Sequence, residues 1–479
     1  MKPRVHGAQR REATLLVGAV VFFGILVALS QLLRRSALET TLRPTIDTDP
    51  LIDDSLHLHH LNAICAQAKD AIVPHSYNSS VLDMTHVWQR TRDQQTLRQL
   101  LSQCPQVDVF LPRYLRTRGG CEDAMAYVKF LRARALPRWV FDLSWSIHGE
   151  VQTYFDLCPE TALVFLGHDW GGLDKLPSFP ADKRVILMAN VESPELEPYH
   201  LHRADFVLAK TQDAHDRLRA WYKASGNPRQ TRVLYTQHTS SNPALAVARD
   251  ASLHRPAQDF NQLRFVHANG PSERKGTAEL LACWAARPDF PLLDVYASDA
   301  ASQAAYNALF PDPSRVPSNL RYHHGTDLSP FNFGRVLVQA SVVLCPSTQE
   351  SFGHSINQAR AAGALVAATG ARPMSELVTP ASGVLIPAVP DDGWPQLLAS
   401  QYWFWQRQRS LRFTVSASAI CRSVDDILAM PASERAARAR NGQTQYYEQL
   451  VQFKDAMRAL RVALIVPDTS PESLPTALA

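Results

Sequence analysis

The stretch from Ser341 to Glu376, which reads SVVLCPSTQESFGHSINQARAAGALVAATGARPMSE, indicates the fold of this chain. The apolar run 342–344 predicts a short strand, and Gly353 then allows a tight turn into a helical run over 354–362. A second apolar run follows at 364–368, so the pattern predicts a βαβ unit of a parallel sheet. The helix would begin at the carboxyl end of that sheet, where free backbone N–H groups and the positive end of the helix dipole suit a phosphate.

Two series of alternating strands and helices surround this unit. We expect strands of the first series at 107–111, 139–141, 163–166, 185–188, 206–209 and 233–235. We expect strands of the second series at 263–268, 292–297 and 320–323, after a polar linker from Asn242 to Asp259. Such alternation predicts an α/β protein with two Rossmann-like, doubly wound domains.

The residues Glu350-Ser351-Phe352-Gly353-His354 resemble the donor-binding signature of GT-B glycosyltransferases, in particular the "group 1" retaining branch. That branch has Glu-Gly-Phe-Gly-Leu, and a second Glu eight positions after the first. This chain departs from the pattern with Ser351 in place of the first Gly and with Gln358 in place of the second acid. The resemblance implies that Glu350 holds hydroxyls of the donor sugar and that Gln358 holds the ribose.

A pair of cations, Arg274 and Lys275, stands between a predicted strand and a helix that starts at Thr277. Arginine binds a phosphate as a fork and lysine as a point charge, so the pair suits a diphosphate. A solvated surface pair is the alternative. The GT-B branch has a basic Arg/Lys-Lys-Gly element at this place, and the resemblance therefore implies a diphosphate site.

Further site residues are implied by the same resemblance. Glu376 matches an acid that faces the donor, although it could also be an acid at the start of a helix. His168, at a strand end of the first domain, matches a histidine that approaches the donor sugar. The pair His168-Asp169 could instead form a capped turn, and the segment 190–192, Asn-Val-Glu, competes for the same role.

Gly119 and Gly120 resemble the glycine turn through which the first domain approaches the donor phosphate, before a helix predicted from Glu122 to Arg134. The family's reaction needs no metal ion and no cofactor. The resemblance thus implies transfer of a sugar from a nucleotide-diphosphate sugar to a glycan, lipid or protein, with retention of configuration. A GT-B sugar-nucleotide epimerase and a non-catalytic two-lobed sugar-binding protein remain as alternatives.

The N-terminal residues suggest a membrane anchor. A basic tail (1–14) precedes an apolar run (15–33), which is long enough to span a bilayer, and residues 34–60 resemble a non-periodic stem. A cleaved signal peptide is the alternative. We expect a single-pass type II protein that faces the Golgi or ER lumen if the host is eukaryotic, with Asn78 as a glycosylation site.

Together with these patterns, the GT-B resemblance implies an acceptor domain over 61–245 and a donor-binding domain over 260–430 that face a cleft, and helices over 431–465 that cross back to the first domain. Four of the seven cysteines could pair in an oxidising lumen, namely Cys65, Cys104, Cys121 and Cys158. Cys283 and Cys345 lie in apolar runs and are expected to be buried thiols.

Composition limits the other function classes. The chain has 479 residues, which suits two domains and an appendage, and its charged and hydrophobic fractions, 20% and 46%, are those of a globular protein. A formal net charge of +4 gives no reason to expect nucleic acid as a partner. No spacing of Cys and His resembles a zinc site.

Overall fold

The computed structural model describes residues 48–78, 87–147, 149–250, 258–326, 328–391 and 411–465. Residues 49–479 form one compact unit. The predicted tail (1–14) and membrane span (15–33) lie outside the described residues. Within the described ranges, no helix is long and apolar enough to cross a membrane.

The first sheet has seven strands in the order β1-β3-β2-β6-β7-β8-β9, and every neighbouring pair is parallel except β1 and β3. Its strands are β1 (Val73–Pro74), β2 (Val107–Phe110), β3 (Arg134–Leu136), β6 (Ala162–Leu166), β7 (Val185–Met188), β8 (Phe206–Ala209) and β9 (Arg232–Tyr235). The helices of this part are α2 (Thr48–Gln67), α3 (Gln94–Leu101), α4 (Arg118–Leu131), α5 (Tyr154–Leu157), α6 (Pro198–Arg203) and α7 (Gln212–Ser225). A small hairpin pairs β4 (Ser144–Ile147) with β5 (Glu150–Thr153). Together these elements are called the first half below.

The second sheet has six parallel strands in the order β12-β11-β10-β13-β14-β15. Its strands are β10 (Phe265–Gly270), β11 (Leu293–Ala297), β12 (Leu320–His324), β13 (Val342–Cys345), β14 (Leu365–Thr369) and β15 (Gly383–Ile386). The helices are α9 (Thr277–Ala286), α10 (Ala300–Leu309), α11 (Pro330–Gln339), α12 (His354–Ala361), α13 (Met374–Leu377) and α15 (Ala417–Ala429), and β16 (Val389–Pro390) pairs with β17 (Phe413–Thr414). These elements are the second half. The prediction of an α/β protein with two parallel, doubly wound sheets is confirmed.

The predicted βαβ unit is present as β13, α12 and β14. Val342 pairs with Leu365 in a parallel register, and all four residues of β13 are buried, as expected for a strand that is covered on both faces. Gly353 caps α12 with a φ of 108°, a conformation that other residues rarely adopt. A β-carbon there would also lie 3.0 Å from the side chain of Ile356.

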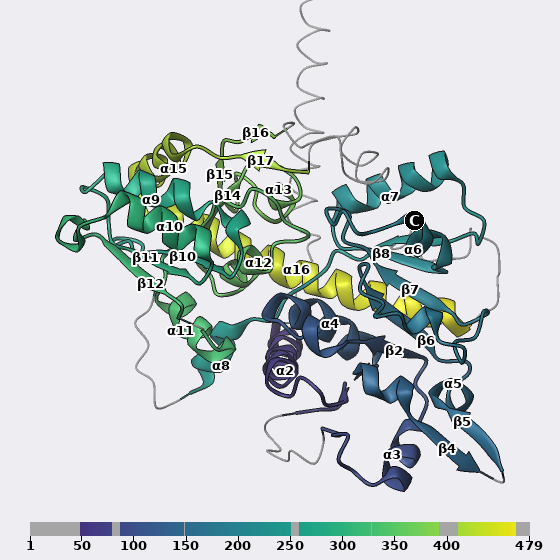
Figure 1. Cartoon of the computed structure of the whole chain (residues 1–479). Coiled ribbons are helices and arrows are strands. Elements are labelled where there is room, and N and C mark those ends of the chain that lie inside the picture. Colours follow the sequence, from purple (N-terminus) through teal and green to yellow (C-terminus); the bar gives the residue numbers. More distant parts are fainter. Residues whose placement is uncertain are drawn as a thin grey trace, which may run out of the picture. The chain divides into compact units, whose positions relative to one another are not determined.

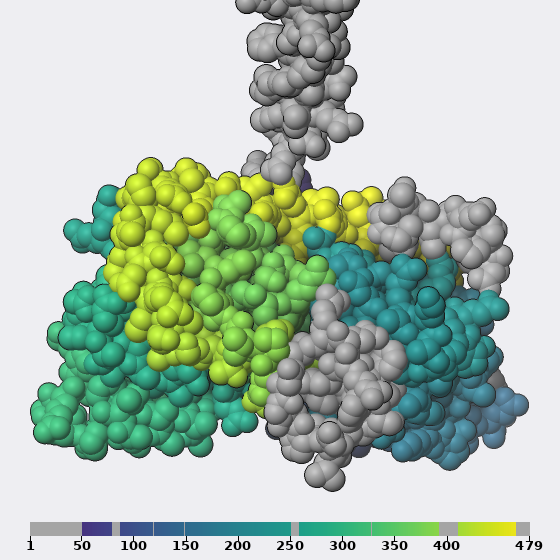
Figure 2. Space-filling model, turned by 90° about the horizontal axis from the view of Figure 1, so that it is seen from above, coloured from purple at the N-terminus to yellow at the C-terminus, as the bar shows by residue number. Residues whose placement is uncertain are grey.

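The helix α16 (Ala432–Ile465) connects the two halves as one continuous helix of 34 residues. It contacts α12, β14 and β15 of the second half and α4 of the first half. Near its end, Phe453, Met457 and Leu460 belong to the hydrophobic core of the first sheet. Figure 1 shows α16 running between the two halves, and in Figure 2 its yellow atoms border both green and teal residues.

Three sequence predictions were wrong in detail. Residues 48–60, assigned to the stem (34–60), lie in α2, because Leu58 and Leu61 are fully buried in the core of the first sheet. Residues 139–141 form a 3₁₀-helix rather than a strand, since all three side chains are buried and the sheet position belongs to β3. The linker from Asn242 begins as the helix α8 (Pro243–Arg249), which packs on α11, where a β-carbon at Gly334 would lie 2.3 Å from the carbonyl oxygen of Pro243.

Three disulfides hold the described residues together: Cys65–Cys121, Cys104–Cys158 and Cys283–Cys421. The first two join the four cysteines that were expected to pair, whereas the prediction of a free thiol at Cys283 was wrong because α9 and α15 pack side by side. Cys345 is free and buried.

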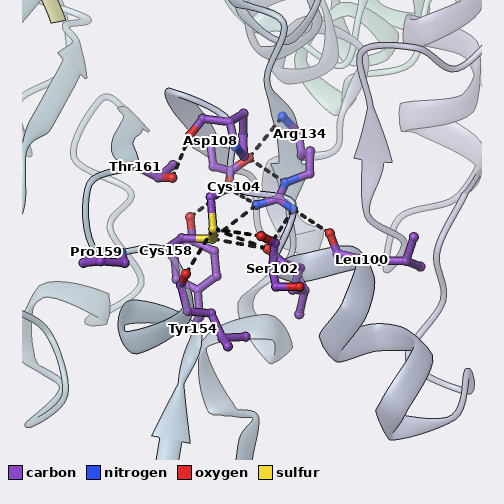
Figure 3. The surroundings of a disulfide bond; sticks show 12 residues. Leu100, Ser102, Cys104, Asp108, Arg134, Tyr154, Cys158, Pro159 and Thr161 are labelled. Carbon is purple, nitrogen blue, oxygen red and sulfur yellow. Dashed lines mark hydrogen bonds and ion pairs between the residues drawn. A yellow bond between two sulfur atoms is a disulfide. The ribbon is translucent and has the colours of Figure 1, made fainter. Parts of the chain in front are cut away.

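A buried ion pair lies beside the Cys104–Cys158 disulfide (Figure 3). Arg134 donates from Nη2 to Asp108 Oδ2 at 2.6 Å, and the Tyr154 hydroxyl donates to the same oxygen at 2.7 Å. A buried carboxylate is tolerated where it is paired and hydrogen-bonded in this way. This network links the neighbouring strands β2 and β3 of the first sheet.

Candidate functional site

Two sequence motifs meet at the carboxyl end of the second sheet. Lys275, in the turn after β10, donates from Nζ to the carboxylate of Glu350, in the loop after β13. The turn needs a glycine at position 276, where φ is 68° and a β-carbon would lie 2.2 Å from the carbonyl oxygen of Pro346. The carboxyl ends of parallel strands meet at one sheet edge, which is why two motifs 75 residues apart come into contact.

Arg274 lies beside this pair with an exposed side chain. Opposite it in the first half, Ser193 contacts His168 Nδ1 at 3.0 Å and donates to Glu195 Oε2 at 2.7 Å. The hydrogen bond from Ser193 lowers the pKa of Glu195, and the charges of His168 and Arg274 lower it further. His168 and Arg274 thus act electrostatically on the same carboxylate, from opposite halves of the protein.

Ser351 also reaches the first half, because its hydroxyl donates to the carboxylate of Glu192. Burial raises the pKa of Glu192. Glu192 belongs to the Asn-Val-Glu segment that competed with His168 in the sequence, and its contact with Ser351 places it against the second half. Phe352, which follows Ser351 in the chain, is 2% exposed and packs in the core of the second sheet.

His354 takes part in a buried polar cluster whose other members come from the first half. Its Nε2 lies 3.0 Å from Asp123 Oδ1, and the Nε2 of His238 lies 3.2 Å from the same oxygen. Lys210 Nζ donates to both oxygens of Asp123 at 3.1 Å. Burial alone would raise the pKa of Asp123, but the Lys210 ammonium and His354 hold it well below its usual range.

Asp123, His238 and His354 are the one group among the described residues whose ligand atoms, all within 4.8 Å of one another, could hold a metal ion. The Lys210 ammonium already neutralises the carboxylate of that group, and it would repel a dication placed there. Burial lowers the pKa of His238 to about 4, so this imidazole is neutral at pH 7. The cluster is better described as a cation–carboxylate contact between the halves.

Gln358 is committed to a contact between the halves. Its Nε2 donates to Glu122 Oε1 at 2.8 Å, and Glu122 also accepts from the backbone N–H and the hydroxyl of Ser241 at 2.8 and 2.7 Å. Gln358 and Glu122 are 7% and 8% exposed. Burial raises the pKa of Glu122. The amide at position 358 therefore donates to a partner to which an ionised acid could not donate, and the ribose contact of Gln358 stays a prediction.

Glu376 caps a helix of the first half. Its two carboxylate oxygens accept from the backbone N–H groups of Gln212 and Asp213 at 2.7 and 2.8 Å, which are the first two residues of α7. The sequence alternative, an acid at the start of a helix, is confirmed, because Glu376 lies in the first turn of α13. The helix that its carboxylate contacts is a different one, 163 residues away in the chain. Burial raises the pKa of Glu376 despite these bonds.

Gly119 and Gly120 lie in the first turn of α4, which begins at Arg118, so the predicted turn at this place is helical instead. Thr117 caps the helix by accepting from the Gly120 N–H, which explains the earlier start. A β-carbon at Gly120 would lie 2.0 Å from the Leu115 carbonyl oxygen. Sequence reasoning missed Glu122 and Asp123 on the next turn, because two acids on a helix look like an ordinary solvated face.

No family model matches the sequence, and no curated protein matches it either. Among solved structures, HepE of Anabaena in complex with UDP-glucose aligns at 15% identity over 72% of this chain and 90% of its own, with a TM-score of 0.45. Sucrose-phosphate synthase of Thermosynechococcus elongatus aligns at 16% identity over 69% of this chain and 84% of its own, with a TM-score of 0.43. Trehalose-6-phosphate synthase OtsA aligns at 11% identity over 64% of this chain and 72% of its own, with a TM-score of 0.45. At these values the likeness carries no conclusion about activity.

Proposed function

We propose that the protein is a glycosyltransferase of the GT-B fold that transfers a sugar from a nucleotide-diphosphate sugar to a glycan, lipid or protein acceptor. The observation that carries the proposal is the contact between Lys275 and Glu350, beside the N-terminus of α12 and the exposed Arg274. This arrangement offers cations to a diphosphate and a carboxylate to sugar hydroxyls within one site.

The proposed chemistry is transfer with retention and without a metal ion. The bond between the anomeric carbon and the diphosphate oxygen breaks, the acceptor oxygen bonds to that carbon on the same face, and the acceptor proton goes to the leaving phosphate. Negative charge develops on the diphosphate, where Arg274, Lys275 and the N–H groups at the start of α12 stabilise it. Glu350 positions the donor sugar, and His168 approaches it from the first half.

The remaining residues of the motif have supporting roles in this proposal. Ser351, Phe352, Gly353 and His354 shape the entrance to α12, and Gly119 with Gly120 brings the first half close to the donor phosphate. Gln358 and Glu376 would reach the donor only after releasing Glu122 and the N-terminus of α7, so donor binding would rearrange the contacts between the halves.

We also propose that the protein is membrane-anchored, with the described residues in the lumen of the Golgi or ER if the host is eukaryotic. The apolar run 15–33 and the basic tail before it support the anchor. The disulfides Cys65–Cys121, Cys104–Cys158 and Cys283–Cys421 support an oxidising compartment. Protease protection in intact microsomes tests the orientation, and digestion of the folded region without detergent would contradict it.

A binding protein without catalysis is the second candidate, because the amide of Gln358 already has Glu122 as its partner. A panel of nucleotide sugars, screened by thermal shift and by sensitive donor hydrolysis, separates the two functions. An enzyme would bind a donor and hydrolyse it slowly, whereas a binding protein would bind and not hydrolyse. In an enzyme, Glu350→Gln should lower kcat with little change in nucleotide Kd, since only contacts that strengthen in the transition state affect the chemical step.

A further inference from the structure

A cavity of about 170 Å³ lies where the two halves and α16 meet. Its walls include Tyr235 at the end of β9 and Gln237 just after it, both in the first half, Arg360 of α12 in the second half, and Gln449 of α16. The cavity is smaller than pockets that enclose drug-sized ligands, which have volumes of about 300–1,000 Å³. Arg274, Lys275 and Glu350 do not line it, but Phe352 and Glu376 do, so the cavity adjoins the proposed donor site without containing its two cations.

Arg360 is the unusual residue in this wall. It is 2% exposed, and its guanidinium donates only to uncharged oxygens: the Leu377 carbonyl at 2.5 Å, the Asn357 amide at 2.6 Å, and the Gln449 amide. Among the described residues, no carboxylate forms an ion pair with Arg360, and its Nε–H has no hydrogen-bond partner. A buried cation without a counter-ion is costly, and burial indeed lowers the pKa of Arg360 to about 9, which still leaves it charged at pH 7.

The other charged groups of the cavity are already compensated. Lys210 pairs with Asp123, and Glu376 accepts two backbone N–H groups of α7. Glu448 also lines the cavity, from α16, and is partly exposed to solvent, which screens its charge. Gln237 adds a second buried polar atom without a partner among the described residues, its side-chain oxygen. The assignment of oxygen and nitrogen in an amide is interchangeable, so this side chain can present an N–H donor instead.

We propose that this cavity binds a small oxyanion, the phosphate or carboxylate group of a small molecule, with Arg360 as its cationic contact. A guanidinium matches the planar fork of a carboxylate or two oxygens of a phosphate. The anion would supply the missing counter-ion and accept from the unpartnered Nε–H. Because the walls of the cavity come from both halves and from α16, a bound anion would also stabilise this arrangement of the halves.

The test measures thermal unfolding of the protein at increasing inorganic phosphate and constant ionic strength, balanced with chloride. The background is the double variant Arg274→Ala/Lys275→Ala, which removes the proposed diphosphate site. In this background the melting temperature should rise and saturate with phosphate. Adding Arg360→Met should abolish the rise, whereas the matched change Arg438→Met, at a partly exposed arginine of α16 paired with Glu434, should leave it intact.

Gln237→Ala gives a second measurement if Arg360→Met does not fold, and it should raise the phosphate concentration at half-effect several-fold. Glucose 1-phosphate and glucuronate, titrated in the same way, show whether the group is a sugar phosphate or a sugar acid. The proposal would be overturned if phosphate raised the melting temperature equally with and without the Arg360→Met change. It would also be overturned if phosphate did not raise the melting temperature of the double variant Arg274→Ala/Lys275→Ala. Donor binding by the wild-type protein is measured separately, so failure of the oxyanion site is distinguishable from failure of the glycosyltransferase proposal.

Discussion

Replacing Gln358 by Glu should destabilise the protein, although the family pattern has an acid at this position. In the structure, the Gln358 amide donates to the buried Glu122 carboxylate at 2.8 Å. The substitution replaces this donor by a second carboxylate. The lost hydrogen bond to a charged group costs about 1.5–3 kcal/mol, and removing one partner of a buried charged contact costs about 3–5 kcal/mol in comparable cases. We therefore expect a loss of about 3–5 kcal/mol at pH 7.

The assay is urea unfolding at pH 7 and at pH 5. Two neighbouring carboxylates can share one proton, and burial already raises the pKa of Glu122, so the defect of Gln358→Glu should shrink at the lower pH. The exchanged pair Glu122→Gln/Gln358→Glu should recover most of the stability at both pH values, because it restores one donor and one acceptor.

Gln303→Glu is a matched control, since Gln303 is a partly exposed residue of α10 that bonds to Asn307 within the same helix. It should change the unfolding free energy by less than about 0.5 kcal/mol. If Gln358→Glu were as stable as the wild type, or if the exchanged pair were no better than the single variant, the contact between Glu122 and Gln358 would not explain the amide.

Other parts of the site lead to three further predictions. Arg274→Ala should weaken donor binding by a factor of about 10–100, since a charge-assisted hydrogen bond contributes about 1.5–3 kcal/mol, and unchanged donor Kd by calorimetry would contradict the diphosphate site. Glu376→Ala should cost about 0.5–2 kcal/mol in urea unfolding because the N–H groups of Gln212 and Asp213 lose their acceptor, although Thr211 still caps α7, and a change in kcat at full stability would instead indicate a donor contact. Burial lowers the pKa values of His238 and His267 to about 4, so the unfolded chain binds protons that the folded protein does not. The contribution of these two histidines to the free energy of unfolding should be fully present above pH 6.5 and should be lost as the pH falls from 6.5 to 4. A flat profile of urea midpoints over this window would refute the neutral, buried imidazoles.

The unit from Ser341 to Glu376 could be predicted because its determinants are local. A glycine with positive φ starts α12, apolar runs of strand length flank it, and helices separate the strands, so a parallel sheet follows from short-range patterns. The contact between Lys275 and Glu350 was not predicted, because it depends on β10 and β13 being neighbours in the sheet, although β11 and β12 come between them in the sequence. The charge and hydrogen-bonding capacity of these side chains are properties of the residue types themselves.

The partners of the remaining site residues depend on how distant segments pack. Gln358 and Glu122 are 236 residues apart, and the Glu376 contact with α7 spans 163 residues. Nothing near either residue in the chain distinguishes a buried contact between two halves from a ligand contact or a solvated surface. The same holds for Cys283, whose partner lies 138 residues away, and for residues 48–60, whose helix is stabilised by the core of the first sheet. Residue type thus determines which contacts a side chain can form, whereas tertiary packing selects among them, because burial removes the competing water and leaves each polar group only the partners placed beside it.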